Sequence, residues 1–450
     1  MNTKRYQYLS ILGLMFFLAS YLFVSDLVVT NSISNDNIIE PTRINSTEDW
    51  TFTWGGPLDE FALDVEFDQN GSIYLIGYTY SYGKGSTDLA LVKLSPDGNK
   101  DWNITWGGSD HDRGSDLIFG SNGDIYVAGW TTIGGSDDFA LIKIFPNGTT
   151  SWNVTWGGSG IDYGKAIGLS IDDFFYISGW TRSFGAGSYD FALVKFSLNG
   201  TLIWNVTWGG SVQDGSNDLA LGPDGAIYLV GYTNSFGAGM YDIALLKYYP
   251  NGTLAWNVTW GGVDYDAGYE IIIGNDGYIY VVGETKSFGA GDSDLVFLKF
   301  NTDGELLFNV TWGGPSYDSS NDLVMDSHGN IYVIGRTKSY GAGNTDFAIL
   351  NFNSNGNLIW SETWGSTDEE KATGIGISQD NYLYVCGYTN HSTAGGYDFL
   401  LVKYKSISSP SQSIPVFELP YTLLGFFILI YLVHFYIAKP KRLKNNSNTF

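Results

Sequence analysis

Acidic side chains recur at two places in a repeated pattern along this chain. The first set lies six residues after each of seven tryptophans and comprises Glu60, Asp112, Asp162, Asp214, Asp266, Asp318 and Glu370. The second set ends a Gly-rich stretch in each repeat and comprises Asp88, Asp138, Asp190, Asp242, Asp294, Asp346 and Asp398. Pairs of carboxylates with backbone carbonyls nearby are ligands for hard cations, and calcium is the natural candidate outside a cell.

These carboxylates have two interpretations. As calcium ligands, the candidates are the aspartates of the first set, namely Asp112, Asp162, Asp214, Asp266 and Asp318. Alternatively, each aspartate accepts hydrogen bonds from the amides of its own Gly-rich turn, as turn aspartates usually do. The sequence has no EF-hand loop and no Gly-Gly-x-Gly-x-Asp run. Occurrence in all seven repeats favours hydrogen bonding, so we expect no obligatory cofactor, with calcium as the alternative.

A third recurring position differs between the repeats. Just before a threonine present in every repeat stand Tyr78, Trp130, Trp180, Tyr232, Glu284, Arg336 and Tyr388. Aromatic rings there could stack on sugar rings, with the carboxylate and the guanidinium adding polar contacts. We therefore take these seven residues as the candidate ligand-binding set. The alternative is that the aromatics pack inside the fold and that Glu284 pairs with Arg336, a contact worth about 0–1 kcal/mol if exposed.

Residues typical of enzymes are scarce. The chain has four histidines and one cysteine, Cys386, so neither a disulfide framework nor a thiolate zinc site can form. No Gly-x-Ser-x-Gly or His-Glu-x-x-His sequence is present. We expect no catalysis, with a carbohydrate-active enzyme that uses two carboxylates as the alternative. Cys386 replaces small or apolar residues of other repeats, which predicts a place in the core.

The elements that position these residues follow from the repeats. Trp-Gly-Gly begins at Trp54, Trp106, Trp156, Trp208, Trp260 and Trp312, and Trp364-Gly-Ser is the seventh instance, which gives units of about 52 residues. Each unit contains four short apolar runs separated by Gly-containing turns, a pattern typical of a four-stranded antiparallel blade. Most tryptophans fall on two positions of the fourth run, where we expect them to pack between blades.

The ends of the repeat array predict how it closes. The array starts with a lone fourth strand, Trp50–Trp54, and the seventh unit ends after its third strand, 398–404. We therefore predict an all-β fold, a seven-bladed β-propeller in which the N-terminal strand completes the last blade and removes the free sheet edges. In such a propeller the loops that follow strands two and four share one face, so both acidic sets should lie on that face.

Several stretches resemble a known repeat family. They are Gly329-Asn-Ile-Tyr-Val-Ile-Gly-Arg-Thr337, Asp190-Phe-Ala-Leu-Val-Lys195 and Trp208-Gly-Gly210. They are similar to the units of the bacterial β-propeller repeat family called SBBP, and the resemblance covers residues 49–404. It implies an extracytoplasmic propeller and brings no catalytic residues with it.

Segments outside the repeats predict a membrane protein. An apolar run after Lys4 and Arg5 has the form of a secretory signal or an N-terminal anchor. A second uncharged run near the C-terminus is long enough to span a bilayer and ends in a basic flank, typical of the cytoplasmic side. The predicted divisions are a signal or anchor (1–30), a linker (31–48), the propeller (49–404), a Ser/Pro stalk (405–415), a transmembrane helix (416–438) and a basic cytoplasmic tail (439–450). The propeller is then held outside the cell by one helix, or by two if the first run is uncleaved.

The charge restricts the partners. The chain has 47 acidic against 23 basic residues, a net charge of −24, and several of the basic residues lie in the tails. An acidic surface repels phosphate backbones, which excludes nucleic acid as a partner. Neutral glycans, cations and basic proteins remain.

Glycosylation sequons occur at one position of the fourth strands, at Asn103, Asn153, Asn205, Asn257 and Asn309. The alternative is that Asn-x-Thr simply suits an exposed edge strand.

Taken together, the sequence predicts a cell-surface binding or adhesion module for a glycan, an envelope component or a protein. A structural surface-coat protein and an extracellular carbohydrate-active enzyme are the alternatives, because the propeller fold hosts all three.

Overall fold

The computed structural model describes residues 48–390 and 395–404. The predicted signal or anchor, the stalk, the transmembrane helix and the basic tail lie outside the described residues, as does nearly all of the predicted linker. Every regular element in the described part is a β-strand. No helix in those two ranges is long and apolar enough to cross a membrane.

The strands form seven antiparallel sheets of four, which we number as blades 1 to 7. From the innermost strand outwards, blade 1 contains β2 (Glu60–Phe67), β3 (Ile73–Thr79), β4 (Asp88–Leu94) and β5 (Lys100–Trp106). Blade 2 contains β6 (Asp112–Phe119), β7 (Ile125–Ile133), β8 (Ser136–Ile144) and β9 (Thr150–Trp156). Blade 3 contains β10 (Asp162–Leu169), β11 (Phe174–Thr181), β12 (Asp190–Ser197) and β13 (Leu202–Trp208).

The remaining blades repeat this order. Blade 4 contains β14 (Asp214–Leu221), β15 (Ile227–Thr233), β16 (Asp242–Tyr248) and β17 (Leu254–Trp260). Blade 5 contains β18 (Asp266–Ile273), β19 (Ile279–Thr285), β20 (Asp294–Phe300) and β21 (Leu306–Trp312). Blade 6 contains β22 (Asp318–Met325), β23 (Ile331–Thr337), β24 (Asp346–Phe352) and β25 (Leu358–Trp364). Blade 7 contains β26 (Glu370–Ile377), β27 (Leu383–Thr389), β28 (Asp398–Tyr404) and β1 (Glu48–Trp54).

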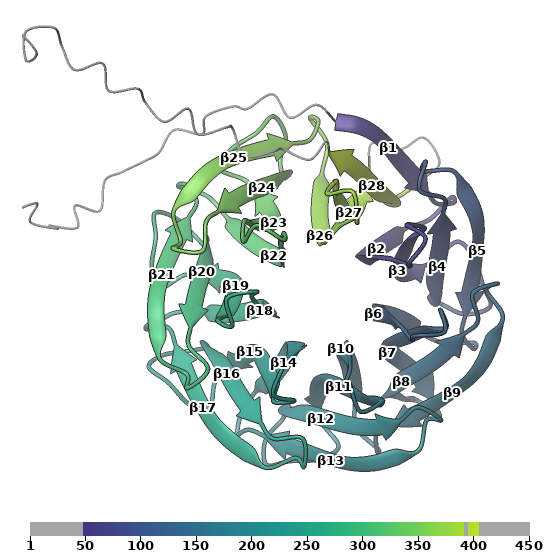
Figure 1. Cartoon of the computed structure of the whole chain (residues 1–450), viewed down its shortest axis with the longest axis horizontal. Helices are drawn as coiled ribbons and strands as arrows, with labels where there is room; N and C mark the ends of the chain where they lie inside the picture. Colours follow the sequence, from purple (N-terminus) through teal and green to yellow (C-terminus); the bar gives the residue numbers. More distant parts are fainter. Residues whose placement is uncertain (1–47, 391–394, 405–450) are drawn as a thin grey trace, which may run out of the picture. The chain divides into compact units, whose positions relative to one another are not determined.

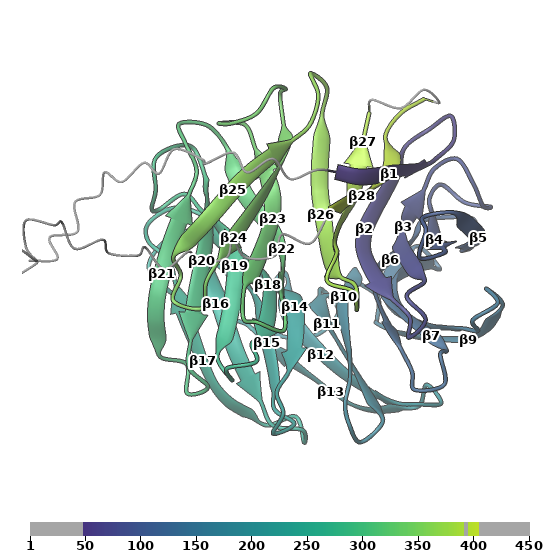
Figure 2. The ribbon, with the colours of Figure 1, turned by 45° about the horizontal axis from the view of Figure 1, so that its top comes forward.

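The seven sheets surround a common axis, with the first strand of each repeat innermost (Figure 1). The predicted closure is confirmed, because β1 pairs antiparallel with β28 and opposes Thr51 to Val402 and Trp54 to Phe399. Figure 2 shows β1 beside β28 in the turned view as well. Blade 7, the last of the array, is thus completed by β1, the first strand of the array. This pairing covers an edge of β28 that would otherwise be open to another strand.

Tryptophans of the outer strands join neighbouring blades, as predicted. Trp50 of blade 7 packs on Gly98 in a turn of blade 1, and Trp102 of blade 1 packs on Gly148 in the matching turn of blade 2. Gly98 has a φ of 81°, a conformation that favours glycine, and a Cβ there would lie 2.7 Å from the Trp50 ring. The hairpin turn and the interblade contact therefore require the same glycine.

The core lies between the blades. Each hydrophobic cluster combines the second and third strands of neighbouring sheets, and one joins Ile73 and Leu75 of blade 1 to Phe399 and Leu401 of blade 7. Cys386 belongs to this cluster and is fully buried as a free thiol, so its predicted core position is confirmed.

A β-bulge interrupts the middle of every innermost strand. In β2 the register shifts between Ala62 and Asp64, and the other six innermost strands shift at the matching place. The extra residue turns two consecutive side chains, such as Leu63 and Asp64, towards the axis of the ring. This irregularity builds the inner surface described next.

Candidate functional site

A channel of about 690 Å³ runs between the innermost strands. Its walls are formed mainly by the bulge residues of the seven blades. These are Leu63 and Asp64, Ser115 and Asp116, Lys165 and Ala166, Asn217 and Asp218, Tyr269 and Glu270, Asn321 and Asp322, and Thr373. Its size lies within the range of small-molecule sites, which typically measure roughly 300–1,000 Å³.

Carboxyl groups dominate the middle of the channel. The second bulge residue is acidic in five of the seven blades, and Glu66 of blade 1 lies two residues further along its strand. We call these six side chains the acidic belt: Asp64, Glu66, Asp116, Asp218, Glu270 and Asp322. Blades 3 and 7 interrupt the belt, since they carry Ala166 and Gly374 at this place.

Hydrogen bonds to the next blade fix the belt. A carboxylate oxygen of Asp116 accepts from the backbone N–H of Ile167 at 2.7 Å, and Asp322 accepts from Ile375 at the same distance. In both pairs the N–H lies just beyond the bulge of the following blade. These hydrogen bonds therefore connect adjacent blades and fix the positions of the belt carboxyl groups.

The first bulge residue strengthens some of these stitches. The Ser115 hydroxyl donates to the carbonyl of Gly164 at 3.0 Å, and the Asn217 amide donates to the carbonyl of Gly268 at 2.8 Å. Each contact again crosses to the next blade. A Ser-Asp or Asn-Asp pair thus binds both sides of the neighbouring bulge.

Two pairs of carboxyl groups in the belt interact across blade boundaries, Asp218 with Glu270 between blades 4 and 5 and Asp64 with Asp116 between blades 1 and 2. A carboxyl group can donate a hydrogen bond to a carboxylate only when it is protonated. Protonation of one partner in a pair therefore turns repulsion between the blades into attraction.

Desolvation inside the channel favours the protonated forms. It raises the pKa of Asp218 to about 6, and together with the charge of Asp64 it raises the pKa of Glu66 to about 8. The pKa values of Asp116, Glu270 and Asp322 also lie well above their ordinary range for this reason. At neutral pH the belt therefore contains both hydrogen-bond donors and acceptors.

Basic side chains complete the lining. Lys165 replaces the polar first bulge residue in blade 3, and desolvation and the charge of Arg113 lower its pKa. Lys371 forms an ion pair with Glu369 at 2.8 Å. The channel thus combines an acidic majority with amino groups from blades 3 and 7.

The candidate ligand-binding aromatics form a stack between blades at one end of the channel. Phe61 contacts Tyr78 of its own blade with ring centroids 5.0 Å apart. The Arg113 guanidinium lies 3.9 Å from the centre of the Tyr78 ring. Trp130 stacks on Tyr163 of the next blade at 4.5 Å. These side chains therefore pack on one another in a continuous chain of contacts.

The other candidates extend this arrangement. Trp180 packs against Tyr163 at 4.3 Å, and Tyr232 contacts Tyr241 at 5.6 Å. Trp130 is only 7% exposed and Glu284 only 5%. The remaining candidates are partly buried, namely Tyr78, Trp180, Tyr232, Arg336 and Tyr388.

Glu284 and Arg336 meet through a third residue. The Tyr317 hydroxyl is hydrogen-bonded to the Glu284 carboxylate and accepts a bond from Arg336 at 2.7 Å. Of the seven candidates, Arg336 and Tyr388 line the channel. The structure thus brings these two to the channel and places the others between blades, while ligand contact by this set stays a prediction.

The candidate calcium ligands are buried acceptors of hydrogen bonds. Asp214 is bonded to the Thr233 hydroxyl, to the N–H of Gly210 at 2.8 Å and to the Ser235 hydroxyl at 2.6 Å. Asp112, Asp162, Asp266 and Asp318 follow this pattern in part or in full. The hydrogen-bonding interpretation therefore describes their contacts.

The second acidic set also accepts bonds from its turns. One oxygen of Asp88 accepts from the N–H groups of Lys84 and Gly85 at 3.0 and 2.9 Å. Within the described residues, no group of three or more His, Cys, Asp or Glu side chains is placed to hold a metal ion. Calcium binding stays a prediction.

The two acidic sets meet at the first glycine of each Trp-Gly-Gly triplet. A Cβ on Gly107 would lie 2.5 Å from an oxygen of Asp88 and 2.5 Å from an oxygen of Asp112. The prediction that both sets share one face is therefore confirmed. The glycine is required by space, since any side chain would displace one of the carboxylates.

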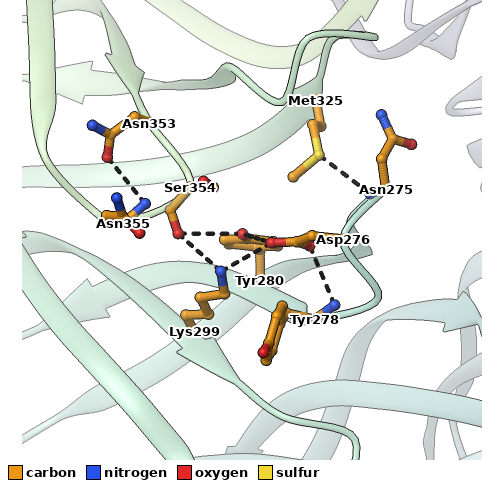
Figure 3. A network of polar contacts seen from close by, with 9 residues as sticks. All are labelled: Asn275, Asp276, Tyr278, Tyr280, Lys299, Met325, Asn353, Ser354 and Asn355. Carbon is orange, nitrogen blue, oxygen red and sulfur yellow. Dashed lines mark hydrogen bonds and ion pairs between the residues drawn. The ribbon is translucent and has the colours of Figure 1, made fainter.

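On the opposite face, lysine side chains form hydrogen bonds that connect adjacent blades. Lys299 of blade 5 donates to Asp276 at 3.0 Å and to the carbonyl of Ser354 in blade 6 at 2.9 Å, and Tyr280 also donates to Asp276 at 2.7 Å (Figure 3). Lys195 reaches a carbonyl of its next blade in the same way. The ammonium groups of these lysines thus donate hydrogen bonds to groups of the propeller itself.

Sequence reasoning missed the acidic belt. Its signal was a polar residue followed by aspartate at the middle of the first strand, at Ser115-Asp116, Asn217-Asp218 and Asn321-Asp322. The predicted sequon asparagines, by contrast, are all exposed on the outer strands, namely Asn103, Asn153, Asn205, Asn257 and Asn309.

Two family models match segments of this chain. A family model described as a domain of unknown function (DUF5122) beta-propeller matches residues 69–101, 120–150, 222–254, 274–306 and 328–358. A model described as a beta-propeller repeat (SBBP) matches residues 312–341. The DUF5122 model thus matches five segments at intervals along the chain, whereas the SBBP model matches one.

One curated relative is the regulatory protein FlaEY of Caulobacter vibrioides, 23% identical over 239 residues. The match covers 43% of this chain and 25% of FlaEY, so this chain corresponds to about a quarter of that protein.

Three solved structures are among those that match this chain. The Pan2 WD40 domain of Neurospora crassa has a TM-score of 0.49 at 11% identity and covers 80% of this chain and 97% of its own. The periplasmic gluconolactonase PpgL of Pseudomonas aeruginosa has a TM-score of 0.49 at 13% identity, with coverages of 75% and 93%. The polysaccharide lyase Uly1 has a TM-score of 0.48 at 10% identity, with coverages of 76% and 89%. The described part of this chain therefore folds as a seven-bladed β-propeller, and segments of it match the models of the DUF5122 beta-propeller domain and of the SBBP beta-propeller repeat.

Proposed function

We propose that this protein is a membrane-anchored binding module whose propeller faces outwards and takes a glycan into the mouth of its central channel. The observation that carries the proposal is the lining of the channel, where protonated and ionised carboxyl groups lie beside aromatic rings. The anchor is the helix predicted for residues 416–438.

Sugar hydroxyls both donate and accept hydrogen bonds. A belt whose raised pKa values keep some carboxyl groups protonated offers both partners, whereas a ring of ionised carboxylates would offer acceptors alone. Tyr269 and Tyr388 line the same cavity and provide apolar faces for the C–H groups of a sugar ring. The volume of about 690 Å³ accommodates the end of a glycan chain.

The negative charge of the protein restricts which glycans the channel could bind. Because the protein carries a net charge of −24 and six acids line the channel, sulfated or uronic acid-rich chains are repelled. Neutral glycans, and glycans with free amino groups, fit best.

The test is a glycan array probed with the full chain in nanodiscs, with and without calcium. Tyr388→Ala should reduce binding, because it removes an aromatic face from the channel. Tyr249→Ala is the matched control, since Tyr249 is exposed in a turn between the third and fourth strands of blade 4. Binding that disappears in both variants, or in neither, contradicts the channel as the site.

The anchoring can be tested independently. Protease added to intact cells should digest the propeller or its stalk and spare an epitope placed at Phe450. An epitope at Phe450 that is accessible from outside contradicts the proposed topology.

One observation favours a second function, that of a carbohydrate-active enzyme. The pKa of Asp218 is raised to about 6 and that of Glu270, on the next blade, lies well above its ordinary range, which suits a base and an acid. Incubation with array-positive glycans should release no new reducing ends if the protein only binds them. Release that Glu270→Gln abolishes would establish the enzyme.

A further inference from the structure

The outermost strands of five consecutive blades carry the same exposed asparagine. It stands in β5, β9, β13, β17 and β21 as Asn103, Asn153, Asn205, Asn257 and Asn309, each followed two residues later by threonine. We propose that these five side chains are acceptors for N-linked glycans, so that a glycan coat covers the outer strands of blades 1 to 5 and leaves the outer strands of blades 6 and 7 bare.

The amides of these five asparagines have almost no structural role. Among the described residues, Asn153, Asn205, Asn257 and Asn309 make no side-chain hydrogen bond, and Asn103 only accepts one from the exposed ammonium of Lys100 at 3.2 Å. Asparagine is also depleted in β-strands. Neither hydrogen bonding nor strand propensity accounts for its recurrence.

The asparagines in the neighbouring turns behave differently. Asn147 accepts a hydrogen bond from the N–H of Thr149 at 3.0 Å, and Asn251 accepts one from Thr253 at the same distance. These bonds are the usual Asx contacts that shape a turn. The Asn-Gly-Thr sequences of the turns thus have a structural explanation that the strand sequons lack.

The fold accepts other residues at the place that these asparagines occupy in the outer strands. Blade 6 has Ser361 there and blade 7 has Thr51, and both blades keep the threonine two residues later, at Thr363 and Thr53. The threonine is common to all seven blades and suits an outer strand. The asparagine that turns it into a sequon is confined to blades 1 to 5.

The chemistry needs a donor that the cell supplies. A lipid pyrophosphate-linked oligosaccharide provides the glycan. The amide nitrogen of asparagine bonds to the first sugar carbon while the bond from that carbon to the pyrophosphate oxygen breaks. The amide loses one proton, and the lipid pyrophosphate leaves with the bonding electrons. No oxidation or reduction occurs.

The outer strands without a sequon belong to blades 6 and 7, next to the point where the chain enters and leaves the propeller. Blade 7 holds both the first and the last strand of the described part, β1 and β28, so the chain enters and leaves the propeller there. Glycans on blades 1 to 5 would leave that side free to approach the predicted anchor. The proposal concerns the outer rim and is independent of ligand binding in the channel.

The test expresses the full chain in a host that attaches glycans at Asn-x-Thr. Peptide-N-glycosidase treatment in heavy-oxygen water marks each occupied asparagine for mass spectrometry. We expect label at the five strand asparagines. Replacing all five by glutamine should remove most of the glycan-dependent mass and leave the melting temperature of the deglycosylated protein unchanged.

The matched control replaces the turn asparagines Asn147, Asn199 and Asn251 by glutamine. This variant should keep the glycan mass of the strand sites. Absence of label on the strand asparagines, or label confined to the turns, overturns the proposal. A large loss of melting temperature in the five-site variant would also overturn it, because it would give the strand asparagines a structural role.

Discussion

Glu270 and Asp218 line the channel on adjacent blades, 5 and 4, and desolvation together with the charge of Asp218 raises the pKa of Glu270. Their strands are 52 residues apart in sequence and belong to different sheets, yet the bulge in each turns the two carboxyl groups towards one another. This arrangement shows how repeated sequence positions come together to line one channel. Equivalent positions in successive repeats become neighbours around the channel.

The first prediction concerns pH. Glu66 has a pKa of about 8 in the folded protein against an ordinary value of 4.5, so the folded state binds more protons than the unfolded state between these values. Its contribution to the free energy of unfolding is therefore fully present below pH 4.5 and is lost as the pH rises towards 8. Asp218 acts in the same direction up to about pH 6.

Melting temperatures of the parent and of Glu66→Gln between pH 5 and pH 8 measure this effect. Lys165 titrates in both proteins, so it cancels in the difference. Glu66→Gln should gain stability relative to the parent as the pH rises. Parallel pH profiles for the two proteins would contradict the raised pKa.

The second prediction concerns the interblade stitches. Asp322→Leu should destabilise the propeller more than Asp322→Asn, because leucine leaves the N–H of Ile375 without its acceptor whereas the asparagine oxygen can replace it. An unmade buried bond costs about 1–3 kcal/mol. Chemical denaturation of both variants gives the difference, and equal stabilities would show that the stitch contributes nothing.

The third prediction concerns the Trp-Gly-Gly triplet. Gly107→Ala would place a Cβ 2.5 Å from both Asp88 and Asp112, whereas Gly108→Ala would meet its nearest neighbour at 3.9 Å. Overpacking of this kind typically costs about 1–3 kcal/mol. Thermal melting should therefore show a loss for Gly107→Ala and a much smaller one for Gly108→Ala, and the reverse order would exclude the steric explanation.

The fourth prediction concerns ring closure. Deleting residues 46–55 removes β1, exposes the edge of β28 and takes Trp50 and Trp54 out of the clusters they join. Loss of a large aromatic side chain from a core typically costs about 3–5 kcal/mol. Light scattering should show association through the open edge, with a much lower melting temperature. A monomer that melts like the parent is incompatible with this closure.

The fold was predictable from the sequence because its determinants are local. Tryptophan spacing, Gly-containing turns and alternating apolar residues each act within one repeat, and the incomplete seventh unit left β1 one place to pair. The position of Cys386 followed from comparing repeats.

The site was less predictable, because it depends on which side chains meet across blades. Strict alternation places Leu63 and Asp64 on opposite faces of β2, and only the bulge turns both towards the channel. Likewise, Glu284 and Arg336 looked like an ion pair in sequence, whereas the hydroxyl of Tyr317 connects them in the structure.

The most direct test of the account is a calorimetric titration of the strongest array glycan into the full chain in nanodiscs. The parent is compared with Tyr388→Ala, with Glu66→Leu, which removes a polar group of the belt, and with Asp101→Asn, a control at an exposed residue of β5. A channel site predicts that the two channel variants bind at least about tenfold more weakly, a loss of about 1.4 kcal/mol, while the control binds like the parent. Parent-like affinity in both channel variants would contradict glycan binding in the channel.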